Sequence, residues 1–73
     1  MKFVAESYIE DVSDMSFFIA QLNTHGIAPK VMGRRIYVTL TDVALDEISF
    51  VLGTFENIPD KAGKNEFSFT IIS

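Results

Sequence analysis

The stretch Arg35–Leu40 constrains the fold most, because its side chains alternate strictly along the chain. Three apolar residues take turns with three more polar ones: Ile36, Val38 and Leu40 against Arg35, Tyr37 and Thr39. This alternation, rich in β-branched and aromatic residues, is typical of a strand that buries one face. Gly33 comes just before it, where a tight hairpin requires a positive φ. We therefore expect a hairpin at Met32–Arg34 that leads into a half-buried strand.

Three further segments predict strands. Lys2–Ile9 alternates, and its smaller, less polar set is expected to face inward: Phe3, Ala5, Ser7 and Ile9. Ile27–Met32 contains Pro29, which has no backbone donor and therefore favours an edge position. Glu66–Ser73 alternates again, with Phe67, Phe69 and Ile71 on one side.

Two amphipathic helices separate these strands. Ser13 is the expected N-cap of the first helix, with Asp14 in its first turn and Gly26 as its left-handed C′ residue. Its apolar stripe recurs at helical spacing: Met15, Phe18, Ile19 and Leu22. Thr41 or Asp42 is expected to cap the second helix. Its predicted buried side is Val43, Ala44, Leu45, Ile48, Val51, Leu52 and Phe55.

The order strand, helix, strand, strand, helix, strand predicts an α+β fold. Two right-handed βαβ crossovers with a hairpin between them give a ferredoxin-like βαββαβ sandwich, with sheet order 4-1-3-2 and both helices on one face. We expect residues 1–73 to form a single domain of this kind. The predicted core is Phe3, Ile9, Phe18, Leu22, Ile36, Val38, Ile48, Leu52, Phe67 and Phe69.

One face of this sheet would carry no helix. By alternation it presents a mixed surface: Val4, Glu6, Tyr8, Lys30, Met32, Arg35, Tyr37, Thr39, Ser68, Thr70 and Ile72. Tyr, Met and Arg are enriched at the cores of protein interfaces. The residues that we predict to bind a partner lie on this face or at the hairpin: Glu6, Tyr8, Met32, Arg34, Arg35 and Tyr37.

Composition narrows the class of function. Ten acidic residues against six basic ones give a net charge of −4, which disfavours binding to nucleic acid and to anionic membranes. The sequence has no Cys, which removes disulfides and thiolate chemistry and fits a reducing compartment. The N-terminal residues contain no apolar stretch long enough for a signal peptide or a membrane span. We therefore expect a cytoplasmic protein.

No motif for catalysis or cofactor binding stands out. His25 is the only His, so a transition-metal site would lack its usual ligands. The four glycines are isolated and form no phosphate-binding loop. The carboxylates Glu10, Asp11 and Asp14 could serve acid–base chemistry, but acids before a helix are typical of a capped helix. We expect neither an enzyme, a metal nor a cofactor.

RNA binding is one alternative, because ferredoxin-like RNA-recognition modules stack bases on aromatic residues of their two central strands. Tyr8 and Tyr37 occupy such positions, with Arg35 and Lys30 nearby. Glu6 on the same face opposes this reading, and Arg34–Thr39 lacks the Gly-Phe core of the strand consensus of those modules.

A small-molecule-binding regulatory domain is the other alternative. The junction Leu22–Ile27 resembles the ACT domain family, in which a Gly and an apolar residue follow the first helix. The resemblance implies the same topology and a ligand-binding regulatory role. The first turn, Asp11–Asp14, lacks the Pro-Gly expected in that family.

The favoured hypothesis is a small acidic protein-interaction module without enzymatic activity. It would bind a partner protein through the helix-free face or an edge strand, as an inhibitor, adaptor or regulator, for example one that a phage encodes against a host protein. The last strand carries Phe67, Phe69, Ile71 and Ile72 along a sheet edge, so we also expect a homodimer.

Overall fold

The computed structural model describes all residues, 1–73, as four strands and two helices. In chain order these are β1 (Lys2–Tyr8), α1 (Val12–Thr24), β2 (Lys30–Met32), β3 (Arg35–Leu40), α2 (Leu45–Glu56) and β4 (Glu66–Ile72). The strands form one antiparallel sheet in the order β2-β3-β1-β4. The predicted ferredoxin-like topology with order 4-1-3-2 is therefore confirmed.

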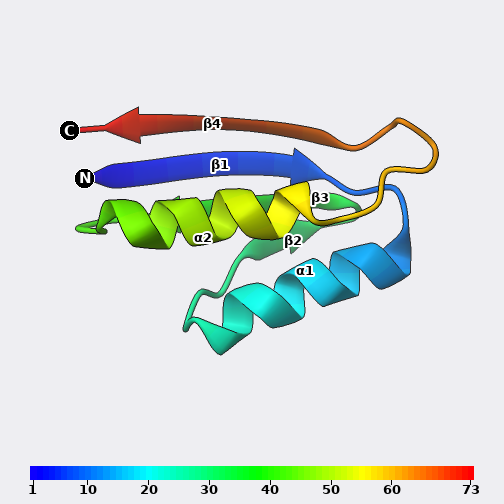
Figure 1. Cartoon of the computed structure of the whole chain (residues 1–73), viewed down its shortest axis with the longest axis horizontal. Helices are drawn as coiled ribbons and strands as arrows, with labels where there is room; N and C mark the ends of the chain where they lie inside the picture. The colour runs from blue at the N-terminus through cyan, green and yellow to red at the C-terminus, as the bar shows by residue number, and fades with distance from the viewer.

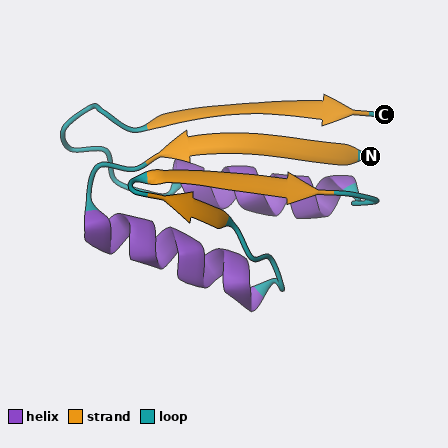
Figure 2. Cartoon of the chain, turned by 180° about the vertical axis from the view of Figure 1, so that it is seen from behind, coloured by secondary structure: helices purple, strands orange, loops and turns teal.

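The two helices form one layer against the sheet. α2 lies in front of the strands in Figure 1 and behind them in Figure 2, and α1 lies beside it. β4 lies at the sheet edge, away from both helices in both views. The chain ends lie side by side, because Lys2 pairs with Ile72. Neither helix has the length and the hydrophobicity that crossing a bilayer requires.

The β2–β3 hairpin turns as the sequence predicts. Met32 pairs with Arg35, so Gly33 and Arg34 are the two turn residues. Gly33 has a φ of +61°, which suits the first central position of a type II′ turn. β2 begins at Lys30 and not at Ile27, because the Ile27 N–H bonds to the Leu22 carbonyl at the end of α1.

The N-terminus of α1 differs from the prediction. Asp11, not Ser13, is the N-cap, and its Oδ1 accepts hydrogen bonds from the N–H groups of Ser13 (2.8 Å) and Asp14 (3.1 Å). The Asp carboxylate satisfies two of the unpaired donors that every helix start exposes, so the helix begins earlier.

The C-terminus of α1 ends as predicted at Gly26. This residue has a φ of +74°, and its N–H bonds to the Asn23 carbonyl at 3.0 Å. The Ile27 N–H bonds to the Leu22 carbonyl, also at 3.0 Å. These two bonds form a Schellman motif, which turns the chain toward β2.

The start of α2 also differs from the prediction. The N-cap is Ala44, without a side-chain hydrogen bond, instead of Thr41 or Asp42. Asp42 has a φ of +55° and lies in the turn before the helix. As the helix begins at Leu45, both Ala44 and Leu45 are exposed, contrary to their predicted burial.

The core lies between the helices and the inner face of β1 and β3. Seven of the predicted core residues are buried: Phe3, Ile9, Phe18, Leu22, Ile36, Val38 and Ile48. Leu52 and Phe67 are only partly buried. Phe69 was expected in the core and is 47% exposed, because no helix covers β4. The structure adds further buried apolar residues: Ala5, Ile27, Val51 and Ile58.

Neighbouring phenylalanines of α1 provide a matched test of the helix face. Phe18 is fully buried and Phe17 is 51% exposed. Phe18→Ala should lower the free energy of unfolding by about 3–5 kcal/mol, because it leaves a core cavity. Phe17→Ala should change it by only about 0.5 kcal/mol. Urea denaturation measures both, and equal losses would show that the helix is rotated.

The N-cap assignment can be tested in the same way. Asp11→Ala should lower the free energy of unfolding by about 1 kcal/mol, because two backbone donors lose their acceptor. Ser13→Ala should stay within about 0.5 kcal/mol of the wild type. A larger loss in Ser13→Ala than in Asp11→Ala would contradict the assigned cap.

Candidate functional site

The register of the sheet sorts the helix-free face into rows that run from β2 through β3 and β1 to β4. One row contains Met32, Arg35, Tyr8 and Glu66. The next row contains Lys30, Tyr37, Glu6 and Ser68. Five of the six predicted partner-binding residues therefore share two adjacent rows. The sixth, Arg34, lies in the hairpin turn at the end of the sheet.

Arg35 is held by carboxylates from two other strands. Its Nη1 donates to Glu6 Oε1 at 2.9 Å, and its Nη2 donates to Glu66 Oε1 at 3.3 Å. Partial burial lowers the pKa of Arg35, but the hydrogen bond to Glu66 and the charges of both carboxylates raise it above its ordinary value. The guanidinium is charged and is fixed from both sides.

Tyr8 lies under this guanidinium. The Arg35 Cζ atom is 5.5 Å from the centre of the Tyr8 ring, within the range of a cation–π contact. The Tyr8 hydroxyl donates to Glu10 Oε2 at 2.5 Å. This hydrogen bond, together with partial burial and the charge of Glu10, raises the pKa of Tyr8, against the lowering effects of Arg34 and Arg35.

The remaining predicted residues surround this Arg35–Tyr8 cluster. Tyr37 is half-buried and lies between Lys30 and Glu6 in the second row. Met32 is 58% exposed. Arg34 is exposed, and its carbonyl accepts the Ile9 N–H at 3.1 Å, which ties the hairpin to the end of β1.

Two partners of the cluster were not among the predicted site residues. Glu66 binds Arg35 and Glu10 binds Tyr8. Glu66 starts β4, and only the register of the β1–β4 pair places it opposite Tyr8. Sequence alternation assigns a residue to a face but does not set this register, so it could not reveal the pair.

The face is close to neutral, although the whole chain carries −4. It holds three basic residues and two acidic ones: Lys2, Lys30 and Arg35 with Glu6 and Glu66. Most of the acidic residues lie on the helices and loops. The helix-free face thus differs in charge from the rest of the molecule.

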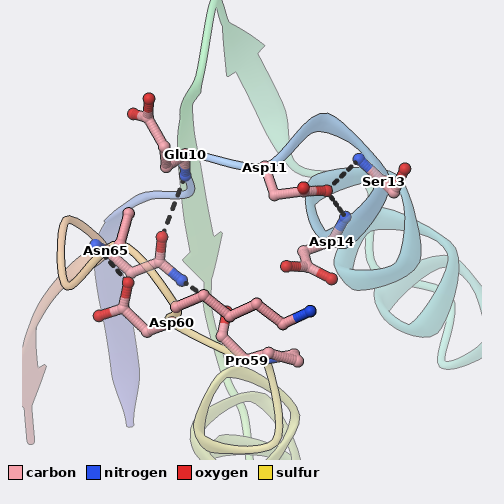
Figure 3. A pocket seen from close by; sticks show the side chains of 9 residues that line it. Glu10, Asp11, Ser13, Asp14, Pro59, Asp60 and Asn65 are labelled. Carbon is pink, nitrogen blue, oxygen red and sulfur yellow. Dashed lines mark hydrogen bonds between the residues drawn. The ribbon is translucent and has the colours of Figure 1, made fainter.

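A pocket of about 420 Å³ lies between the β1–α1 and α2–β4 loops (Figure 3). It brings Glu10, Asp11 and Asp14 close to Lys61. The other lining residues are Ser13, Pro59, Asp60, Ala62 and Asn65.

Several of its polar side chains are used by local structure. Asp11 caps α1. Asp60 Oδ1 accepts the N–H groups of Lys64 (3.0 Å) and Asn65 (3.1 Å), and Asn65 Oδ1 accepts the Glu10 N–H (3.0 Å). The dashed lines of Figure 3 include the Glu10–Asn65 bond, which joins the two loops. The pocket is therefore a loop junction.

Two polar residues outside these clusters, His25 and Ser7, make contacts that have a structural role. His25 is exposed and stacks on Phe50, with ring centres 3.4 Å apart. Ser7 is buried and donates to the Ile36 carbonyl at 3.4 Å. No group of three or more His, Cys, Asp or Glu side chains is arranged to hold a metal ion.

The chain was compared with models of protein families, with curated proteins and with solved structures, and none of these comparisons gives a significant match. The resemblance of Leu22–Ile27 to ACT domains therefore stays a prediction.

The Tyr8–Glu10 bond can be tested by spectroscopy. The protein contains two tyrosines, so Tyr37→Phe leaves Tyr8 as the only tyrosinate chromophore. We expect its absorbance titration to have a midpoint above the ordinary tyrosine pKa of about 10. Adding Glu10→Gln should move this midpoint down, because it removes the charged acceptor. An unchanged midpoint would contradict the bond.

Proposed function

We propose that this chain is a non-enzymatic protein-interaction module of the cytoplasm, acting as an inhibitor, adaptor or regulator. It binds a partner protein through the helix-free face of its sheet. The observation that carries this proposal is the ordered Arg35–Tyr8 cluster, with Met32 in the same row of the sheet and Tyr37 in the next row.

The Arg35 side chain is held in place before any partner binds, and this favours binding. Immobilising a long side chain at an interface costs about 0.5–1.5 kcal/mol. Arg35 is already held by two carboxylates and by the Tyr8 ring, so it loses little freedom when a partner docks. A guanidinium has five N–H donors, and these two bonds leave others for carbonyl or carboxylate oxygens of the partner.

The surroundings of the cluster indicate the chemistry of that partner. Tyr37 offers a ring and a hydroxyl, and Met32 offers a flexible apolar side chain that adapts to irregular surfaces. The face has almost no net charge. It therefore fits a protein surface with an apolar centre and a few acceptor groups, which is the usual composition of an interface.

The same cluster weakens the RNA alternative. Glu6 and Glu66 neutralise Arg35, and both would repel a phosphate that approached it. A site for RNA needs a large surplus of positive charge along the backbone path, whereas this face has only one more basic residue than acidic ones. The ligand-binding alternative has less support too, since Asp11, Asp60 and Asn65 of the loop pocket use their side chains for the helix cap and the loop turns.

The test is capture of partner proteins by the tagged chain from cells of its source. Baits are the wild type, Arg35→Glu/Tyr37→Ala, and Met32→Ala, which adds no charge beside Arg35. We expect the wild type to retain one stoichiometric protein. Both variants should weaken its binding by at least about 30-fold, the effect of losing an interface hot spot of about 2 kcal/mol.

The matched control is Lys61→Glu/Phe17→Ala. It reverses one basic charge and removes one exposed aromatic ring, but away from the sheet face. This bait should retain the partner as well as the wild type does. Circular dichroism checks that each bait is folded. Equal retention by folded face variants, or retention of nucleic acid alone, would contradict the proposal.

A further inference from the structure

β4 is a long strand with a free edge. It has seven residues and ends the sheet, whereas the opposite edge strand, β2, has only three. Unpaired backbone N–H and C=O groups along such an edge are a template for another strand. β4 carries no Pro and has its single charge, Glu66, at its first residue. The devices that usually block edge pairing are therefore almost absent.

The apolar side chains of β4 are also incompletely covered. Phe69 and Ile71 point to the helix side of the sheet, yet they are 47% and 40% exposed. Figures 1 and 2 show why, since neither helix lies over the C-terminal part of β4. Phe55 of α2 stacks on Phe67, with ring centres 4.5 Å apart, and the ring centres of Phe67 and Phe69 are 5.9 Å apart. A row of neighbouring aromatic rings therefore runs from α2 to the open edge.

We infer that β4 pairs antiparallel with β4 of a second copy of this chain, in the register centred on Phe69. Only this register pairs the strand with itself over all seven residues, Glu66–Ile72. It places Phe69 opposite Phe69, Phe67 opposite Ile71, Ser68 opposite Thr70, and Glu66 opposite Ile72.

The pairs between Phe67 and Ile71 match in chemistry on both faces of the sheet. On the helix side every pair is apolar, and aromatic or β-branched pairs across strands stabilise a sheet. On the helix-free side Ser68 lies opposite Thr70. Glu66 lies opposite Ile72 and far from its own copy, so no like charges oppose each other. This self-complementarity is what an isologous two-fold interface requires, and it selects a second copy as the occupant.

The dimer would have one continuous sheet of eight strands. Because the two-fold axis is perpendicular to the sheet, the helices of both copies lie on one side and both helix-free faces on the other. Self-pairing thus uses a different surface from the proposed partner-binding face and leaves that face open.

Single cysteines test the register, because the wild type has none. Ser68→Cys and Thr70→Cys are exposed, conservative changes on the same face of β4. Directly opposed residues have Cα atoms about 4.5–5.5 Å apart, within disulfide range. Diagonal neighbours lie about 7–8 Å apart, which is out of range. We expect oxidation to cross-link a mixture of the two variants, while each variant alone stays uncross-linked.

Two controls make the result decisive. Ser49→Cys, on the exposed side of α2, reports random collision, and its cross-linking with either variant should be low. Light scattering of the wild type should give the mass of two chains. Cross-linking of Thr70→Cys alone or of Ser68→Cys alone would overturn the register by shifting its centre to that residue.

A monomeric wild type with no cross-link in the mixture would overturn self-pairing altogether. That result would leave the partner-binding proposal standing, because the capture experiment tests a separate surface. Failure of the capture experiment would equally leave the dimer intact.

Discussion

β1 is the element on which the rest of the structure depends. It pairs with β3 on one side and with β4 on the other, and it is the only strand that joins the hairpin to the C-terminal strand. One set of its side chains is buried under the helices: Phe3, Ala5 and Ser7. The alternate set, with Glu6 and Tyr8, forms the centre of the helix-free face. One alternating strand thus supplies both the core and the candidate site.

The two helices cover the sheet unevenly. They bury the inner faces of β1 and β3 but reach only Phe67 of β4, so Phe69 and Ile71 stay exposed at this edge. On the other side of the sheet, ion pairs and a cation–π contact fix Arg35 and Tyr8 in place. The molecule therefore has two distinct surfaces: the amphipathic face that we propose for a partner and the edge strand that we propose for a second copy.

Alternation was enough to predict the faces of the strands, because Ile36 and Val38 must lie on the same side of the sheet. Turn chemistry was enough to predict the hairpin and the end of the first helix, because Gly33 and Gly26 both have positive φ there. The sequence did not show which of several polar residues would cap each helix. Asp11, not Ser13, is the N-cap of α1, and α2 begins without a side-chain cap. Phe69 looks like a core residue in the sequence, and only the placement of the helices exposes it. The face of Arg35 was predictable, but its pairing with Glu66 depends on the β1–β4 register.

The central claim is that the helix-free face binds the partner, and methionine methyl NMR of the purified complex tests it most directly. The chain has three methionines, of which Met32 lies exposed on this face and Met15 is partly buried against the core. We predict that the Met32 methyl resonance shifts or broadens on adding the partner, while the Met15 resonance keeps its position. An unchanged Met32 resonance in a saturated complex would contradict the claim and place the partner elsewhere on the molecule.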